Sequence, residues 1–230
     1  VVDLVAYANP SLYVAKPLDV IQLNFFENVK IMDYCIRHGK RLFQYSTSEI
    51  YGKRSTDGTY REDESDLVMG PVTKQRWVYA SGKQFLERIL HAHGLNGDLE
   101  YTIVRPFNFV GPRFDYLVEA GSLGGPRVFA HFMSALITDG PIRLVDGGDQ
   151  RRSFTHIDDA SEAFTILLED PATINQIYNI GNPATDISIR ELAAYMTDIY
   201  EDLTGKTYGG EIIEISGEDF YGKGYEDMNR

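Results

Sequence analysis

The chain has 230 residues, 43% of them hydrophobic and 12% aromatic, which is enough to bury a core and excludes a disordered or fibrous protein. Its 22 basic and 34 acidic residues give a formal net charge of -12, which excludes a general electrostatic attraction to nucleic acid or to anionic membranes. No apolar run approaches the roughly 20 residues of a membrane span. The single cysteine, Cys35, excludes an intrachain disulfide framework and predicts a reducing, cytoplasmic location.

Strands and helices alternate in the first half of the chain. VVDLVAYA (1–8) is an uninterrupted apolar run, typical of a buried strand, and neither a turn nor a helix precedes it, so we expect further sequence before Val1. The next expected elements are a helix at 17–39, a strand at 41–47, a long loop at 52–76, a helix at 77–93 and a strand at 99–106. This alternation predicts an α/β fold with a parallel sheet.

The pattern is less regular after Pro106. The expected elements there are a loop at 111–126, a helix at 127–139, a strand at 141–145, a charged turn at 147–152, a helix at 157–168, a strand at 176–181, a helix at 188–200 and a strand at 211–215. Helices and strands are therefore expected to alternate to the end of the chain.

Tyr79 and Lys83 stand four residues apart at the start of the expected helix 77–93. Residues at this spacing share one face of a helix, so the lysine ammonium can lie near the phenol oxygen and favour its ionised form. A tyrosine, with an ordinary pKa of about 10, needs such a neighbour to act as a base near neutral pH. The spacing alone leaves a surface tyrosine beside a solvated lysine as the alternative.

The run STSEIYG (46–52) comes at the end of the expected strand 41–47. In open parallel sheets, ligands bind beyond the carboxyl ends of the strands. Hydroxyl groups at this place can bind a sugar or a phenol, and the carboxyl group of Glu49 can transfer a proton. A polar strand end, in which Ser and Thr side chains satisfy the backbone of a turn, explains the same run without a ligand.

The order of these motifs resembles a known enzyme family. A D-x-x-x-x-A segment at 3–8, STSEIYG, KQRWVYASGK (74–83) and IVRPFNFVGPR (103–113) follow one another as in the extended short-chain dehydrogenase/reductase family. Segments 144–160, 178–183 and 220–227 agree as well, and the chain is most similar to the UDP-glucuronate decarboxylase branch. The resemblance implies a Rossmann-type parallel sheet that binds NAD, from residues 1–110 and 154–181, and a smaller C-terminal substrate-binding domain, from 111–153 and 182–230.

The resemblance also implies a reaction and its catalytic residues. Tyr79 would remove the proton of the carbon-4 hydroxyl of a UDP-sugar, and Lys83 would hold the nicotinamide ribose and lower the pKa of the tyrosine. Tyr79, Lys83 and Ala6 are the implied cofactor contacts, whereas Glu49 and Ser48 complete the catalytic set. Oxidation at carbon 4 turns UDP-glucuronate into a β-keto acid that loses carbon dioxide. Protonation at carbon 5 then gives a UDP-4-keto-pentose, which is released or reduced to UDP-xylose.

Substrate contacts follow from the same matching. Asn108 would bind the diphosphate, Tyr225 would close over the sugar, and the arginines supply the local basic cluster that an acidic protein needs for an anionic ligand. Taken singly, each arginine is better explained as a solvated surface charge, and only the matched context favours a ligand contact. The implied substrate contacts are Ala8, Tyr13, Thr47, Ser48, Arg76, Asn108, Arg127, Arg143, Arg151, Arg152 and Tyr225.

The triplet Thr47-Ser48-Glu49 separates related reactions. In family members that are 4,6-dehydratases this triplet looks like Thr-Asp-Glu, and apiose-forming members tend to have Cys at the middle position. Ser48 therefore argues against dehydration and against apiose formation. Simple 4-epimerases usually lack the glutamate. The alternatives that remain are an NDP-sugar 4-epimerase or 4,6-dehydratase and, from another class, a non-catalytic nucleotide-sugar-binding module.

The sequence departs from the family pattern at both ends. The family's glycine-rich phosphate loop would precede Val1, and GSLGG (121–125) does not replace it because it does not follow a strand in a βαβ unit. We therefore expect the N-terminal part of the NAD-binding domain to be missing from this sequence. A catalytic arginine expected six residues after Tyr225 would fall at position 231, so Arg230 is not assigned that role.

Two expectations concern partners and metals. The family commonly pairs two helices per subunit in a four-helix dimer interface, which here would use residues 15–38 and 77–93. The implied partners are thus a UDP-sugar and a second copy of the chain, without nucleic acid or membrane. His91 and His93 point in different directions on a helix, and the acidic residues after His156 suit a helix start, so no metal site is predicted.

Overall fold

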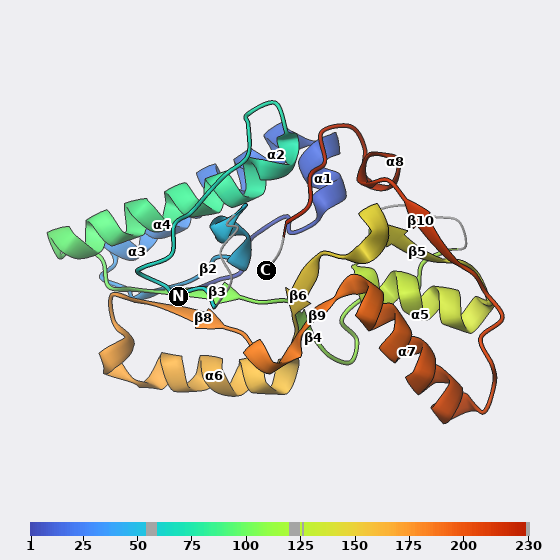
Figure 1. Ribbon diagram of the computed structural model, residues 1–230. Coiled ribbons are helices and arrows are strands. Elements are labelled where there is room, and N and C mark those ends of the chain that lie inside the picture. The colour runs from blue at the N-terminus through green and yellow to red at the C-terminus, as the bar shows by residue number, and fades with distance from the viewer. Residues whose placement is uncertain (54–58, 120–124, 126, 229–230) are drawn as a thin grey trace.

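Four parallel strands form a sheet in the order β1-β2-β3-β8 (Figure 1). The computed structural model describes residues 1–53, 59–119, 125 and 127–228; most of GSLGG (121–125) and Arg230 lie outside them. The strands are β1 (Val2–Asp3), β2 (Leu42–Tyr45), β3 (Tyr101–Pro106) and β8 (Gln176–Ile180). β3 is buried along nearly its whole length, as expected for a parallel strand that is covered on both faces. The expected α/β fold with a parallel sheet is confirmed.

Helices cover both faces of this sheet (Figure 1). One face carries α1 (Pro10–Ala15), α2 (Pro17–Ile21), a π-helix (Gln22–Glu27), α3 (Asn28–Arg37) and α4 (Val78–Asn96), and the other face carries α6 (Ile157–Glu169). Leu86 and Leu90 of α4 pack with Leu42 and Ile103 of the sheet. On the opposite face, Ala160 and Leu167 of α6 pack with Phe43 and Val104. The sheet therefore forms the middle of three layers.

The region before α3 differs from the sequence expectation in two ways. The expected strand 1–8 stops at Asp3, because the side chain of Asn24 satisfies both backbone groups of Tyr7: Oδ1 accepts from its N–H at 2.6 Å and Nδ2 donates to its carbonyl at 3.0 Å. The expected helix 17–39 contains the π-helix Gln22–Glu27, whose extra residue per turn rotates the following side chains. Asn24 of the π-helix and Asn28 of α3 both form hydrogen bonds with the segment 4–9.

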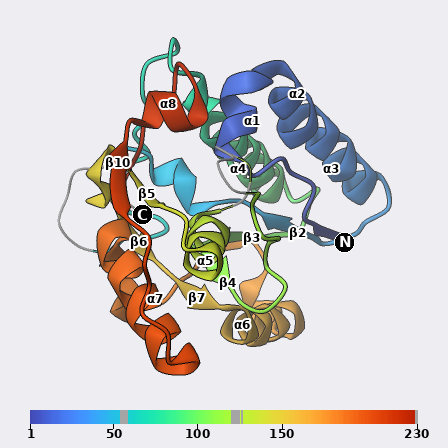
Figure 2. The ribbon, with the colours of Figure 1, turned by 90° about the vertical axis from the view of Figure 1, so that its right-hand side faces the viewer.

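A second group of elements packs beside the sheet and forms a smaller lobe (Figure 2). The strands β5 (Ile142–Val145) and β10 (Ile212–Ile215) pair in parallel, and α5 (Val128–Thr138) and α7 (Ile189–Thr204) share one hydrophobic cluster with β5. A capping box, in which Ser188 and Glu191 bond each other's backbone N–H, begins α7. The short helix α8 (Gly217–Tyr221) follows β10.

Short strands and turns join the two lobes. β4 (Phe109–Val110) pairs with β7 (Thr155–His156), and β6 (Arg151–Ser153) pairs antiparallel with β9 (Asp186–Ser188). The expected charged turn 147–152 is therefore wrong at its end, where Arg151 and Arg152 belong to a strand. The 3₁₀ turns are Ser48–Tyr51, Gln75–Trp77, Asp146–Gly148, Pro171–Thr173 and Pro183–Thr185.

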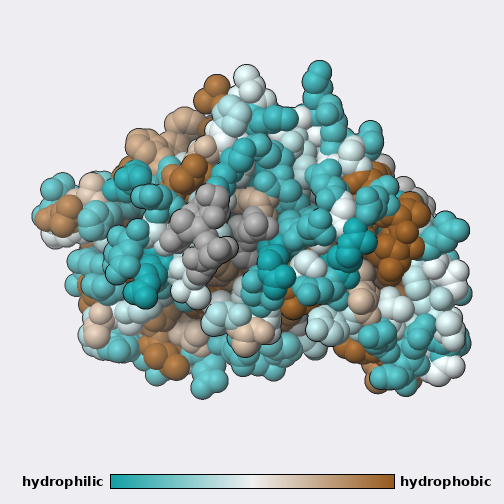
Figure 3. Space-filling view, in the orientation of Figure 1, coloured by the Kyte–Doolittle hydropathy of each residue, from teal (hydrophilic) through white to brown (hydrophobic). Residues whose placement is uncertain are grey.

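The surface seen in Figure 3 is mainly hydrophilic, with separate apolar patches. This matches the high proportion of acidic residues in the chain. Among the helices of the described residues, none has both the length and the apolar character that crossing a bilayer requires.

Candidate active site

A cavity of about 670 Å³ lies beyond the carboxyl ends of β1, β2 and β3. Residues that follow these three strands form one side of it, and α5, β5 and β6 of the smaller lobe contribute to the other. Ligands of open parallel sheets bind at this edge. Most of the residues singled out in the sequence line the cavity: Ala6, Ala8, Tyr13, Thr47, Ser48, Glu49, Arg76, Tyr79, Asn108, Arg127, Arg143, Arg152 and Tyr225.

Ser48 and Glu49 are held by a 3₁₀ turn (Ser48–Tyr51) that starts directly after β2. Thr47 caps this turn, because its hydroxyl oxygen accepts a hydrogen bond from the backbone N–H of Glu49 at 3.1 Å. All three side chains are at most 6% exposed although they are polar. The alternative of a merely polar strand end explains the cap formed by Thr47, but it gives no reason to bury the carboxyl group of Glu49.

Glu49 forms a buried ion pair with Arg76. Arg76 Nη1 donates to Glu49 Oε2 at 2.7 Å, and both side chains are almost completely removed from solvent. Burial disfavours the charge of Arg76, but the adjacent Glu49 carboxylate outweighs this effect and raises the pKa of the guanidinium. Arg76 Nε is buried without a hydrogen-bond partner among the described residues. Arg76 can therefore hold Glu49 in its charged form and still offers a donor at the cavity.

Tyr79 lies on the first turn of α4, where its ring stacks on that of Tyr13 with centroids 4.8 Å apart. It is 5% exposed, which makes the alternative of a surface tyrosine wrong. Lys83, one turn further along α4, is also buried and excludes the alternative of a solvated lysine. Tyr79 thus reaches the cavity while Lys83 lies below it in the protein interior.

The ammonium group of Lys83 is fixed by two acceptors. Lys83 Nζ donates to Asn28 Oδ1 at 3.1 Å and to the carbonyl oxygen of Tyr45 at 3.0 Å. Burial lowers the pKa of Lys83 to about 8, although Asp3 and Glu87 act in the opposite direction. A lysine with this pKa is easily deprotonated when its surroundings change, as proton-transfer sites require.

Asn28 is a site residue that the sequence analysis missed. It is completely buried at the junction of the π-helix and α3, and besides accepting from Lys83 it accepts from Gln44 Nε2 and donates to the carbonyl groups of Val5 and Leu23. An asparagine on an expected apolar helix face was the only available signal. The π-helix brings this face to Lys83, and the apolar spacing did not reveal that geometry.

The candidate arginines of the smaller lobe fall into two groups: three line the cavity and Arg151 does not. Arg127, Arg143 and Arg152 line the cavity, and Arg127 lies over the ring of Phe114 at 4.3 Å. Arg151 is exposed on β6, where its guanidinium bonds Asp186 at 2.9 Å and also contacts Glu191. Neighbours on a strand point to opposite faces, so Arg151 and Arg152 cannot both face one ligand. The geometry therefore places Arg151 apart from the cavity that the other arginines line.

Two further candidates, Asn108 and Tyr225, are each held by a specific contact. Asn108 has a φ of +37° and donates from Nδ2 to the carbonyl oxygen of Ser153 at 2.8 Å, which joins the end of β3 to β6. Tyr225 stacks on Tyr221 with ring centroids 4.3 Å apart, and burial raises the pKa of its phenol well above the ordinary value. Tyr225 is therefore a neutral hydrogen-bonding group at the cavity.

Comparison with known proteins identifies the family. The model described as "NAD dependent epimerase/dehydratase family" matches residues 1–181 of the chain. The chain belongs to this family. Among its curated relatives is the UDP-D-apiose/UDP-D-xylose synthase of Oryza sativa subsp. japonica, which is 42% identical over 100% of this chain and 62% of its own length. UDP-D-apiose/UDP-D-xylose synthase 2 of Arabidopsis thaliana is 39% identical over 100% of this chain and 64% of its own length. The chain thus spans less than two thirds of these relatives.

Solved structures of other proteins have the same fold. The PbgP3 protein of Burkholderia pseudomallei matches with a TM-score of 0.82 and 32% identity, covering 96% of this chain and 73% of its own. The dTDP-glucose 4,6-dehydratase DesIV of Streptomyces venezuelae, solved with NAD and TYD bound, matches with a TM-score of 0.76 over 99% of this chain and 62% of its own. At 20% identity, this second likeness shows the fold alone.

Proposed function

We propose that the chain carries the active site of an NAD-dependent enzyme that oxidises carbon 4 of UDP-glucuronate and releases carbon dioxide, giving UDP-4-keto-pentose or UDP-xylose. The observation that carries the proposal is the buried Glu49–Arg76 pair at 2.7 Å, which lines one cavity with Tyr79. A base, a second proton-transfer group and a buried cation meet there. The curated synthases at about 40% identity support the same substrate class.

The residues present fit the nicotinamide half of NAD. Asp3 Oδ2, Gln44 Oε1 and Ser46 Oγ, at or near the carboxyl ends of β1 and β2, are buried without hydrogen-bond partners in the described part of the chain. Unsatisfied buried oxygens of this kind are expected where a polar ligand completes the site. Ala6, Tyr79 and Lys83 would hold the cofactor there. When bound, NAD supplies the hydride acceptor for carbon 4.

The chain's own residues would act on protons and charge. Tyr79, as the phenolate, takes the proton of the carbon-4 hydroxyl while Lys83 stabilises the negative oxygen. Once carbon 4 is a ketone, the bond between carbons 5 and 6 breaks and carbon dioxide leaves. The electron pair of that bond then forms an enolate over carbons 4 and 5, with its negative charge on the carbon-4 oxygen. Glu49, a carboxylate while it is paired with Arg76, takes up a proton from water that enters the cavity and passes it to carbon 5, and Ser48 and Thr47 orient the sugar. Arg76 attracts the carboxylate at carbon 6 and holds Glu49 in place.

The smaller lobe would hold the nucleotide. Arg127, Arg143 and Arg152 face the cavity, where guanidinium groups suit the diphosphate oxygens. The division of the chain into an NAD-binding domain (1–110 and 154–181) and a substrate-binding domain (111–153 and 182–230) is part of this proposal. The cytoplasmic location stays a prediction from composition.

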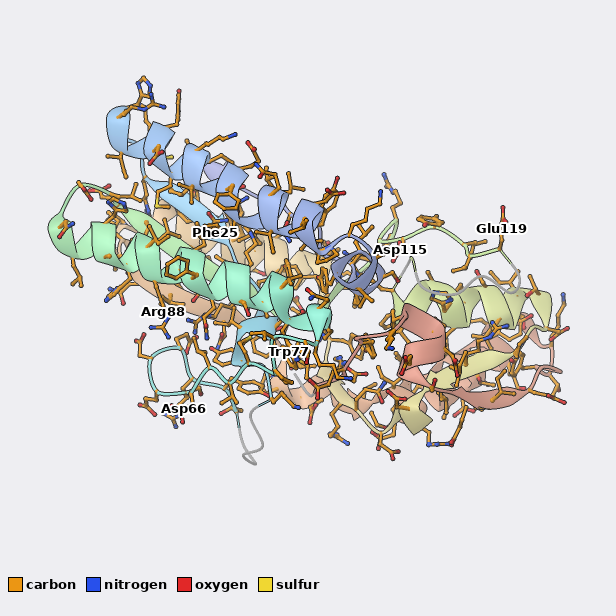
Figure 4. All side chains as sticks on the ribbon, turned by 90° about the horizontal axis from the view of Figure 1, so that it is seen from above. Phe25, Asp66, Trp77, Arg88, Asp115 and Glu119 are labelled. Carbon is orange, nitrogen blue, oxygen red and sulfur yellow. The ribbon has the colours of Figure 1, made fainter. Side chains whose placement is uncertain are left out.

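A second copy of the chain is the proposed protein partner. The helices α2, α3 and α4 lie side by side, with Phe25 between the helical runs (Figure 4). Phe25 stacks on Phe85, and the ring of Phe85 is 56% exposed. A groove of about 440 Å³ on α4 begins at Phe85 and includes Arg88 and Ile89. Exposed apolar side chains on adjacent helices suit a four-helix interface between two copies.

The test is to incubate the intact protein, including whatever sequence precedes Val1, with NAD and UDP-glucuronate while following carbon dioxide release and NADH absorbance. Carbon dioxide with stoichiometric NADH indicates release of the keto-sugar, and carbon dioxide without NADH indicates reduction to the pentose. If the protein binds NAD but releases no carbon dioxide, the proposal is wrong, and an NDP-sugar 4-epimerase or 4,6-dehydratase replaces it.

A further inference from the structure

The last described residues, 222–228, are called here the C-terminal segment. This segment returns from α8 toward the larger lobe (Figure 1). The carbonyl oxygen of Gly224 accepts from the backbone N–H of Arg76 at 3.4 Å, and Tyr225 and Asp227 line the cavity. The position of the C-terminal segment therefore decides how two cavity side chains are presented.

Glu226 lies between these two residues but does not line the cavity. It makes two other contacts. Its Oε1 accepts from Lys53 Nζ at 2.5 Å, and its Oε2 accepts from the indole N–H of Trp77 at 2.8 Å. Lys53 follows the turn that carries Glu49, and Trp77 lies at the N-terminal end of α4, two residues before Tyr79 (Figure 4). One carboxylate thus joins the C-terminal segment to both elements that carry the proposed proton-transfer groups.

Asp227 makes the corresponding contact with the smaller lobe. Its Oδ1 accepts from Arg152 Nη2 at 2.6 Å, and the carbonyl oxygen of Met228 accepts from Arg152 Nη1. Burial opposes the charge of Asp227, but Arg152 outweighs this effect and lowers the pKa of the carboxyl group. The guanidinium of Arg152 is therefore oriented by the residue next to Glu226.

We propose that Glu226 is a positioning residue: by bonding Lys53 and Trp77 it fastens the C-terminal segment so that Tyr225 and the Asp227–Arg152 pair face the nucleotide-sugar. The proposal rests on the proposed function for the identity of the ligand. It assigns no contact between Glu226 and the substrate. Loss of the Glu226 carboxylate removes the contacts of the segment with Lys53 and Trp77, so that the Asp227–Arg152 pair is held less firmly.

The contacts of Glu226 are suited to testing because their removal should leave the fold intact. The Lys53 and Glu226 side chains are 40% and 26% exposed, and ion pairs of this exposure contribute little to global stability. Trp77 is the only tryptophan in the chain, so its fluorescence reports on the bond to Glu226 without any activity. It is 3% exposed, which predicts weak quenching by acrylamide in the unaltered protein.

The experiment compares Glu226→Ala and Lys53→Met with the control Glu218→Ala, which removes an exposed carboxylate from α8. Titration with UDP alone should show a dissociation constant about tenfold higher for Glu226→Ala, because Arg152 is then held less firmly in the orientation that faces the diphosphate. Lys53→Met should raise it by a smaller factor, and the double variant should match Glu226→Ala. Acrylamide quenching of Trp77 should increase in Glu226→Ala and stay unchanged in the control.

Three results would overturn the proposal. They are unchanged UDP affinity in Glu226→Ala, equal effects in Glu218→Ala, and no UDP binding by the unaltered chain. The test also separates this proposal from the proposed function. If no carbon dioxide is formed from UDP-glucuronate but Glu226→Ala still weakens UDP binding, the decarboxylase proposal fails and the role of Glu226 stands. In the carbon dioxide assay, KM for UDP-glucuronate should rise by more than kcat falls.

Discussion

The carboxyl group of Glu49 is buried beside the guanidinium of Arg76, and this ion pair favours a charged acid in the protein interior. Burial alone would favour the neutral acid, whereas Arg76 at 2.7 Å favours the carboxylate. A substrate carboxylate placed near Arg76 would compete for the same cation. In the proposed reaction this competition would weaken the Glu49–Arg76 ion pair while the substrate is bound.

Replacement of Glu49 tests this role directly. Glu49→Gln keeps the shape of the side chain but cannot protonate carbon 5, the step that follows the loss of carbon dioxide, so steady-state turnover of UDP-glucuronate should fall by at least about 100-fold. The rate is measured with saturating NAD and UDP-glucuronate, together with UDP affinity, which should change little. Glu119→Gln, on the exposed loop at the far end of the molecule (Figure 4), is the control. A Glu49→Gln variant with the full rate would remove Glu49 from the mechanism.

The lowered pKa of Lys83 predicts how the free energy of unfolding changes with pH. Its pKa is about 8 in the folded chain, below the ordinary 10.5, so between these values the unfolded chain binds more protons. Stability therefore rises with pH across this window, and a variant without the amine lacks the increase. From pH 7 to about pH 9.5 the unaltered protein should gain about 2 kcal/mol relative to Lys83→Met, at 1.36 kcal/mol per pH unit above 8.

Urea unfolding at the two pH values measures this difference. Other lysines and tyrosines titrate in the same range, but they are common to both proteins and cancel in the comparison. If the difference in free energy of unfolding between the two proteins does not change with pH, Lys83 keeps an ordinary pKa.

At the scale of elements, β3 and α4 are joined by a buried ion pair. Arg105 Nη2 donates to Glu87 Oε2 at 2.7 Å, and Arg105 Nη1 donates to the hydroxyl of Tyr51 at 2.9 Å. Tyr51 ends the turn that begins with Ser48. The strand, the helix and the turn that carries Glu49 are therefore held by one guanidinium.

Removal of Glu87 should destabilise the protein more than removal of the whole pair. Glu87→Leu leaves the charge of Arg105 buried without its partner and should lower the free energy of unfolding by roughly 3–5 kcal/mol. The double variant Glu87→Leu with Arg105→Met should lose less, although it also lacks the contact with Tyr51. Urea denaturation at neutral pH gives both values. Equal losses in the single and double variants would contradict an uncompensated charge.

The sequence predicted elements whose signal is local and missed those that depend on distant contacts. Apolar runs indicated β2, β3 and β8, and apolar spacing indicated α4, α5, α6 and α7 close to their observed bounds. The strand β6 has the polar sequence RRS and forms only because β9, more than 30 residues later, pairs with it. The π-helix was also missed, although the five-residue step between the apolar residues Val20 and Phe25 lies across it.

In the candidate site, too, the sequence revealed the local motifs and missed the residues that depend on distant contacts. STSEIYG and the Tyr79–Lys83 spacing indicated the strand end and helix turn that line the cavity, because both motifs are short and continuous. Asn28 was missed because its importance arises from partners at 5, 23, 44 and 83. The pairing of Arg76 with Glu49 was missed for the same reason, and only the resemblance to a family had brought Arg76 to notice.

At the scale of the whole molecule, the exposed helices of the larger lobe predict a dimer. Phe85→Glu places a charge in the proposed interface and should convert the dimer to a monomer, as measured by sedimentation velocity at micromolar concentration. Leu203→Glu is the control, because this side chain is 81% exposed on α7 of the smaller lobe. A monomeric unaltered protein, or equal dissociation by both variants, would show that the dimer does not form through α4.

The interleaving of the two lobes affects how the chain is made. Ile142 of β5 pairs with Ile212 of β10, and between them the chain returns to the larger lobe to add β8. At a translation rate of about 5–20 residues per second, β5 waits roughly 4–14 seconds for its partner strand to leave the ribosome. During this time the apolar side chains of α5 and β5 lack the cover that α7 later supplies. The nascent chain can therefore complete the four-stranded sheet before β5 of the smaller lobe has its partner strand.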